Sequence, residues 1–332
     1  MPRVIYGVLL CGMTFALLAL LTVAKEQVAA KPDSAEVLGH IARAKQIGGT
    51  FWSREEHFLC EAPRATPTSD PRPARLFDNL YAIPGQYSSQ NGVVYVITTS
   101  AGIMLIDSGW RKDVESVVVG GLNTLGLDPA KIKLIIVAHG HPDHYGGSEY
   151  LQERYGSRVV LSSADWDFMS NLPATAPGRN LGGAAPELSK PPIRDLVARE
   201  GHPIVLGDER VTPVLIPGHT PGSLGLIFPV KDRGKTHVVG IVGGGFIAQG
   251  PPSQVQQFID SLVHFEKWTK KMNVDVELQN HPVMDGFGEK LVTLRERKPG
   301  EPNPFVVGKD NYTKFLEVMT ECARATLARR SE

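Results

Sequence analysis

The sequence has few cysteines, no formal net charge and no long run of like charge. Its 332 residues include only three cysteines, too few for a disulfide framework or a cysteine-rich zinc finger. Its 35 basic and 35 acidic side chains cancel to a formal net charge of zero. Because no long run of like charge offers a footprint for nucleic acid, we expect no nucleic-acid partner.

What the chain does have is enough apolar material for a packed core. Hydrophobic residues make up 42% of the sequence, which argues against global disorder. The length fits one large domain or two ordinary ones. The 34 glycines and 25 prolines indicate many turns and loops.

The first thirty residues have the composition of an export signal. Arg3 is followed by the apolar run 4–23, which contains no charged residue, and small residues follow at Ala24 and at 28–30. We therefore expect 1–30 to be a cleaved signal peptide and the mature protein to be secreted or periplasmic, without membrane contact. The alternative is an uncleaved signal anchor, since about 20 apolar residues can span a bilayer.

Cleavage would leave two cysteines, Cys60 and Cys322. They either remain free thiols, or they pair in an oxidising compartment and tie an N-terminal extension to a C-terminal helix. The sequence leaves both possibilities open.

The mature chain divides into an extension, 31–76, and a larger domain, 77–332. In the extension, Ser34 and Gly48-Gly49 bound a predicted polar helix over 31–48. The chain from 51 to 75 contains four prolines and is expected to be irregular.

The domain alternates β-rich runs with helical segments, and this pattern occurs twice. We predict strands at 80–83, 93–99, 103–107, 132–138, 158–162, 203–205, 211–216, 223–230, 236–242 and 274–278. We predict helices at 112–126, 147–155, 254–271 and 309–330. The pattern favours an α/β fold in which two mixed sheets pack face to face with helices outside.

Four side chains that can bind metal occur within six positions directly after the buried strand 132–138. They are His139, His141, Asp143 and His144. Alternate residues of an extended segment project to one side, so His139 and His141 can chelate one ion. Asp143 and His144, where the chain turns into a helix, can face a second ion. Because a catalytic zinc ion takes three protein ligands and a water, each site needs one more ligand.

His219 and His281 meet that need. Each follows a predicted strand and stands beside glycine or proline, in the kind of loop where functional residues concentrate. Six ligands divided three and three would hold two Zn²⁺ ions per chain, and such a pair can act together on one carbonyl group.

At these residues the sequence resembles the metallo-β-lactamase superfamily, over roughly Leu80 to Leu291. The His-x-His-x-Asp-His motif at 139–144, the turn at 107–109 and the Gly-His-Thr-Pro-Gly-Ser segment at 218–223 carry the likeness. The resemblance implies an αββα sandwich with the metals at one edge. It assigns the first zinc site to His139, His141 and His219, and the second to Asp143, His144 and His281.

One departure from the superfamily pattern narrows the resemblance. Many members, including those similar to glyoxalase II, place a bridging aspartate after the strand that follows the Gly-His-Thr segment. Here that strand ends in Gly243-Gly244-Gly245, and Asp232 lies in a predicted hairpin turn. A ligand set without the bridge looks like the third subclass of class B β-lactamases. The serines with which those enzymes hold the carboxylate of the antibiotic are absent near 243–246.

The function implied is that of a zinc-dependent hydrolase acting on a small-molecule substrate. A metal-bound hydroxide, oriented by Asp143, would open a lactam-type carbonyl; the alternative is a lactone, ester or thioester on the same fold. Two other classes are a non-catalytic metal-binding module, which usually loses ligands, and an iron enzyme, which imidazole and carboxylate ligands also permit. Asp107 is expected to organise the site through hydrogen bonds, and Tyr145 to pack beside it.

Overall fold

The computed structural model describes residues 32–61, 72–85, 92–171, 190–245, 250–281 and 285–331. The predicted signal peptide, 1–30, lies outside these ranges, and the predicted boundary at residue 76 stays a prediction. Residues Asp33–Glu332 cluster by their contacts as one compact unit. Within the described ranges, every helix is too short or too polar to cross a bilayer.

The strands form two mixed sheets. The 7-stranded sheet has the order β1-β2-β3-β4-β5-β6-β7, and the 5-stranded sheet has the order β12-β11-β10-β9-β8. Strands β4 to β7 run parallel to one another, as do β11 and β12, whereas the other neighbours are antiparallel. Their bounds are β1 (Ala74–Arg75), β2 (Leu80–Pro84), β3 (Val93–Thr99), β4 (Gly102–Ile106), β5 (Ile132–Ile136), β6 (Arg158–Ser162), β7 (Leu196–Ala198), β8 (Ile204–Leu206), β9 (Glu209–Leu215), β10 (Leu224–Asp232), β11 (Lys235–Val242) and β12 (Val276–Leu278).

Helices flank the sheets on both outer sides. The α-helices are α1 (Ala35–Gly48), α2 (Ser53–Glu56), α3 (Gly120–Thr124), α4 (Pro142–Tyr145), α5 (Ser148–Tyr155), α6 (Ser163–Asn171), α7 (Pro252–Met272), α8 (Phe287–Glu296) and α9 (Lys309–Ser331). The short 3₁₀ and π segments are η1 (His57–Glu61), η2 (Arg111–Asp113), η3 (Val114–Val119) and η4 (Pro129–Lys131).

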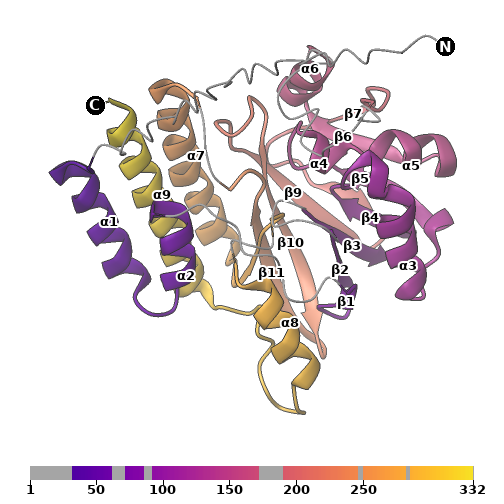
Figure 1. Ribbon diagram of the computed structural model, residues 1–332. Coiled ribbons are helices and arrows are strands. Elements are labelled where there is room, and N and C mark those ends of the chain that lie inside the picture. Colours follow the sequence, from indigo (N-terminus) through magenta and orange to yellow (C-terminus); the bar gives the residue numbers. More distant parts are fainter. Residues whose placement is uncertain are drawn as a thin grey trace, which may run out of the picture. The chain divides into compact units, whose positions relative to one another are not determined.

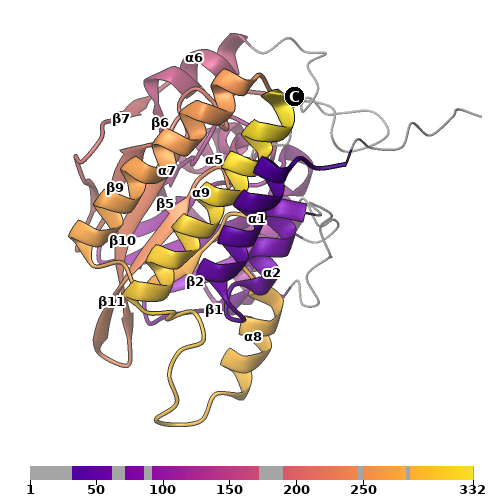
Figure 2. The same ribbon diagram turned by 90° about the vertical axis from the view of Figure 1, so that its left-hand side faces the viewer.

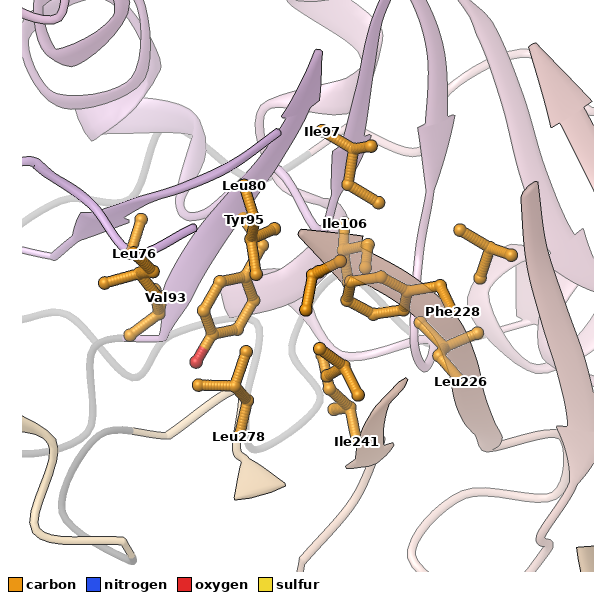
Figure 3. Packing of buried hydrophobic residues seen from close by; sticks show 14 of the residues in the cluster. Leu76, Leu80, Val93, Tyr95, Ile97, Ile106, Leu226, Phe228, Ile241 and Leu278 are labelled. Atoms are coloured by element: carbon orange, nitrogen blue, oxygen red, sulfur yellow. The ribbon is translucent and has the colours of Figure 1, made fainter. Parts of the chain in front are cut away.

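The side-chain alternation of β3 shows how the layers are built. Tyr95 and Ile97 belong to the cluster between the two sheets, whereas Val94 and Val96 belong to the cluster on the outer side. Figure 3 shows Tyr95 and Ile97 facing Leu226, Phe228, Ile241 and Leu278 of the other sheet. A strand that is apolar on both faces must be covered on both, which explains its unbroken apolar sequence.

Two sets of helices complete the covering. Buried residues of α1, α7 and α9 pack with Val214, Ile227 and Val242 of the 5-stranded sheet, and Figure 2 shows these three helices side by side. Buried residues of η3, α3, α5 and α6 cover the outer face of the 7-stranded sheet (Figure 1). The architecture is therefore the predicted αββα sandwich.

The predicted strands are confirmed within a few residues, and 93–99 and 158–162 agree to the residue. The helices predicted at 147–155, 254–271 and 309–330 are confirmed likewise. The segment predicted as one helix at 112–126 is instead divided into η2, η3 and α3, because its consecutive valines and glycines at 117–121 have low helix propensity.

The expectation of irregular chain over 51–75 is wrong for 53–61, where α2 and η1 form, and for 74–75, where β1 forms. Residues 62–71 lie outside the described ranges. The reason for the helical segment 53–61 is burial: Trp52, Glu55 and Phe58 all pack inside. The prolines that suggested irregularity come later in the chain, at 63 and beyond.

A disulfide joins the N-terminal extension to the last helix. Cys60 of η1 pairs with Cys322 of α9, across 262 residues, with the Cα atoms 4.6 Å apart. Both cysteines lie in the cluster that holds α1 and α9 against the sheet. The sequence left open whether these cysteines are free thiols or a disulfide, and in the structure they form a disulfide.

We predict that removing this disulfide destabilises the fold. A cross-link over so long a loop restricts the unfolded chain, and losing a native disulfide typically costs about 2–5 kcal/mol. The double variant Cys60→Ala/Cys322→Ala should have a lower Tm than the wild type and should not respond to reductant. An equal Tm for the wild type before and after complete reduction, checked by thiol titration, would contradict this.

Buried ionisable side chains of α2, β12 and α8 lie near one another. Glu55 is 4% exposed and Glu277 of β12 is fully buried, and Lys290 of α8 donates to Glu277 at 3.0 Å. Burial, followed by repulsion from Glu277, raises the pKa of Glu55 to about 7, although Lys290 and Arg54 oppose this rise. Glu55 is therefore largely protonated below neutral pH.

This pKa predicts a pH dependence of stability. The folded chain holds the Glu55 proton more tightly than the unfolded chain, whose carboxyl titrates near 4.5. The free energy of unfolding should therefore fall as the pH rises from about 4.5 to about 7. Glu55→Gln should remove this contribution and stabilise the protein by about 1–3 kcal/mol at pH 8, with little effect at pH 4.

Denaturant unfolding of the variant and the wild type at both pH values measures the difference. Glu296→Gln, at an exposed position of α8, is the matched control and should change stability little at either pH. A Glu55→Gln variant that is less stable than the wild type at pH 8 would contradict the assignment.

Candidate metal centre

The six predicted ligands lie on three loops that follow strands. His139, His141, Asp143 and His144 follow β5, His219 follows β9, and His281 follows β12. The helix α4 begins at Pro142, whose ring fits the first position of a helix. This turn separates His139 and His141 from Asp143 and His144, as the sequence predicted. The structure brings all six together as two groups of three.

The first group consists of His139, His141 and His219. The Nε2 atom of His219 lies 3.1 Å from Nε2 of His139 and 3.0 Å from Nδ1 of His141. Three nitrogens bound tetrahedrally to zinc at 2.0–2.1 Å would stand about 3.3 Å apart. The donor set and its spacing therefore fit a zinc ion.

The second group consists of Asp143, His144 and His281. Nε2 of His144 lies 3.1 Å from Nε2 of His281 and 3.3 Å from Oδ2 of Asp143. Oδ2 of Asp143 lies 3.6 Å from Nε2 of His281. Two imidazoles and a carboxylate at these distances also suit zinc. The two groups adjoin, because the ring centroids of His139 and His144 are 3.9 Å apart.

Burial sets the protonation of the first group. Burial, and then the nearby imidazoles of His144 and His219, hold the pKa of His139 well below its usual value. Burial and His219 likewise lower the pKa of His141 to about 3. Both rings are therefore neutral at pH 7, which is the state in which imidazole binds metal.

The second group has an internal charge balance. Burial opposes ionisation of Asp143, but the charge and hydrogen bond of His144 outweigh it and lower the pKa of Asp143. Burial also opposes charge on His144, but Asp143 and then Asp107 overcome it and raise the pKa of His144 to about 10. A metal bound at this group would take the place of the His144 proton.

Asp107 orients His144, as predicted. It follows β4 and adopts the left-handed backbone conformation, with φ 63°, which aspartate tolerates better than most residues. Its Oδ2 accepts from Nδ1 of His144 at 2.7 Å, and its Oδ1 accepts from the Ala138 backbone N–H at 2.7 Å. This contact directs Nε2 of His144 into the second group, the usual arrangement for a metal-binding histidine.

Comparison with known proteins finds a matching family for part of the chain. Residues 90–233 match the model of the metallo-β-lactamase superfamily. In structure the chain is similar to BJP-1, a subclass B3 metallo-β-lactamase of Bradyrhizobium japonicum. The sequences are 29% identical and the TM-score is 0.61, over 75% of this chain and 90% of that chain. Residues 90–233 belong to the metallo-β-lactamase superfamily.

Curated relatives share the same region. A probable metallo-hydrolase of Bacillus subtilis, YflN, is 27% identical over 41% of this chain and 54% of its own length. A hydroxyacylglutathione hydrolase of Acidiphilium cryptum is 23% identical over 42% of this chain and 48% of its own length. The chain spans about half the length of these two relatives.

The structure explains why a metallo-β-lactamase fold has no bridging carboxylate here. Gly244 follows β11 and lies against His219. A Cβ atom at Gly244 would stand 2.6 Å from Cβ of His219, and one at Gly243 would stand 2.1 Å from the carbonyl oxygen of Leu224. Asp232 lies in the β10–β11 hairpin and pairs with Arg297 at 2.7 Å. Even a Cβ atom at Gly244 would therefore require the side chain of His219 to shift.

A small hollow, with room for about one water molecule, lies near the second group. Its lining residues are Ile83, Gly85, Gly92, Val94, Gly109, Trp110, Asp113, Val117 and Val118. Gly92 connects it to the centre, because a Cβ atom there would stand 3.5 Å from Cε1 of His144. Most of the lining residues are apolar. The hollow adjoins the candidate ligands through Gly92.

The other histidines lie outside both groups, as expected. His40 contacts Glu321, His57 contacts Glu61, and His202 contacts the backbone carbonyl of Glu200. His237 contacts Asp275, and His264 contacts the side chain of Glu200. Tyr145 is fully buried in the outer cluster of the 7-stranded sheet, so its packing role is confirmed. Sequence reasoning missed Asp165 in α6, and the one available signal was an acidic residue just after the strand 158–162.

We predict that Gly244→Ala weakens zinc binding. The new methyl group would displace His219 from its partners in the first group. Zinc affinity, measured by competition with a chromogenic chelator, should fall about tenfold or more. Gly120→Ala, where a Cβ atom would meet nothing closer than 3.6 Å, is the control and should bind zinc like the wild type. Unchanged affinity in Gly244→Ala would contradict the close approach.

Proposed function

We propose that the protein is a zinc-dependent hydrolase of small-molecule carbonyl compounds that holds two Zn²⁺ ions. The observation that carries this proposal is the convergence of six donor atoms in two adjoining groups, at 3.0–3.6 Å. Hydrolase names among the relatives support the reaction class. A purely structural zinc site would have four protein ligands, whereas each group here has three.

The residues of the chain have distinct roles in this proposal. His139, His141 and His219 hold the first ion, and Asp143, His144 and His281 hold the second. Zinc lowers the pKa of bound water from about 15.7 to about 7, and so supplies hydroxide at neutral pH. Asp143, which remains ionised, accepts a hydrogen bond from the attacking water and orients it toward the carbonyl carbon.

A β-lactam is the substrate that we propose first. The similarity to a subclass B3 metallo-β-lactamase over three quarters of the chain supports it, as does the ligand set without a bridging carboxylate. The reaction would add water across the C–N bond of the ring, and the nitrogen would take up the proton.

The second candidate is hydrolysis of a thioester, lactone or other ester. A relative that is a hydroxyacylglutathione hydrolase supports the thioester. In addition, the described residues 243–245 are all glycine, so they offer no side-chain hydroxyl for the carboxylate of a β-lactam. The two candidates share the metal centre and differ only in the leaving group.

We also propose that the protein is exported. The composition of 1–30 supports a signal peptide. The Cys60–Cys322 pair supports the same conclusion, since disulfides persist in oxidising compartments such as the periplasm.

A substrate panel tests the proposal. Zinc-loaded protein is assayed with nitrocefin, a carbapenem, an acyl-homoserine lactone, an aryl ester and an acyl-glutathione thioester. We expect turnover of the two β-lactams. His141→Ala should lose the first ion and nearly all turnover, whereas His264→Ala, on the exposed side of α7, should retain both.

The outcomes separate the candidates. Turnover restricted to the thioester, lactone or ester would show that the β-lactam proposal is wrong and the second candidate right. No turnover of any substrate by protein that holds zinc would contradict the hydrolase. Full zinc content and full activity in His141→Ala would contradict the assigned ligands.

A further inference from the structure

A second buried carboxylate lies near the metal centre, on a helix that carries none of the proposed ligands. Asp165 of α6 is fully buried. Its Oδ2 accepts from the backbone N–H of Gly140 at 2.7 Å and from the hydroxyl of Thr220 at 2.6 Å. Its Oδ1 accepts from the backbone N–H of Gly222 at 2.7 Å. Three donors thus converge on one carboxylate.

These donors belong to the two loops that form the first group. Gly140 lies between His139 and His141, and Thr220 follows His219 directly. The Ser223 hydroxyl extends the network, because it accepts from the Thr220 backbone N–H at 3.0 Å and lies 2.6 Å from the Thr220 hydroxyl. Asp165 therefore joins the chain segments that carry all three histidines of the first group.

The loops are also packed closely on the start of α6. A Cβ atom at Gly222 would stand 2.0 Å from the Ser162 hydroxyl and 2.6 Å from the backbone nitrogen of Asp165. A Cβ atom at Gly140 would stand 3.1 Å from the ring of Phe168. Because this packing leaves little free space beside the loops, we expect a change in the Asp165 hydrogen bonds to shift them.

We propose that Asp165 is the positioning residue of the first metal group and acts on that group alone. It does so through backbone N–H groups and Thr220, without touching an imidazole. Asp107 holds the second group by a different route, through Nδ1 of His144. Each metal group then has its own buried carboxylate, and the two can be weakened separately. This inference rests on the proposed metal centre.

Asp165→Asn tests the proposal. The carboxylate offers two accepting oxygens to three donors, whereas the amide replaces one oxygen with an NH₂ group that would face a donor. Asp167→Asn is the matched control, because Asp167 lies on the same helix and its side chain is 60% exposed. The two variants and the wild type are titrated with Zn²⁺ against a chromogenic chelator, and with Co²⁺ by absorption spectroscopy.

Two background variants, each lacking one ligand, show which metal group the Asp165→Asn substitution weakens. In a His281→Ala background, which leaves the first group intact, Asp165→Asn should weaken binding of the remaining ion about 10–100-fold. In a His219→Ala background, which leaves the second group intact, the same change should leave affinity and the Co²⁺ spectrum as they were. Asp167→Asn should have no effect in either background.

Thr220 supplies a second test in case Asp165→Asn folds poorly. Thr220→Val removes the donor but keeps the shape, and should weaken the first group; Thr220→Ser keeps the donor and should restore it. Equal loss at both groups, or no loss at either, would overturn the proposal. If the wild type bound no ions at all, the proposed metal centre itself would fail, which is a different result from an Asp165→Asn variant that behaves like the wild type.

Discussion

The metal centre depends on the parallel pairing of β4, β5 and β6 inside the sandwich. Parallel neighbours end at the same edge of a sheet, so the residues that follow them meet there. Asp107 follows β4, His139 follows β5 and Asp165 comes shortly after β6. Both faces of these strands are packed, so a slip of one residue would exchange the side chains of the two faces and disrupt the packing on both. The sandwich core thereby determines where the polar residues of the edge can lie.

At that edge, buried carboxylates orient the ligands or their loops, and histidines supply most of the donor atoms. Asp107 fixes the tautomer of His144, and Asp165 holds the loops of His139, His141 and His219. Such carboxylates are costly to bury unless donors satisfy them. Here backbone N–H groups supply much of the compensation, so positions next to ligands, such as Gly140 and Ala138, matter through their backbone rather than their side chains.

The sequence predicted those parts of the molecule that local patterns encode. Apolar strands such as 93–99 and the ligand motif at 139–144 are continuous signals, so the fold and all six candidate ligands could be found. The short helix α6 gave no such signal, because Trp166 and Met169 are its only large apolar residues with full burial. Asp165 was missed with it. Likewise, no residue near Glu55 in the sequence shows that the folded chain places it close to Glu277, more than two hundred positions away.

The proposed function depends on two zinc ions, each bound by one of the two groups of three ligands. The most direct measurement is an anomalous difference map from crystals of the protein, recorded above and below the zinc absorption edge. We expect two zinc peaks, one among His139, His141 and His219 and one among Asp143, His144 and His281. No peak at either group in crystals grown with zinc, or zinc held by other residues, would contradict it.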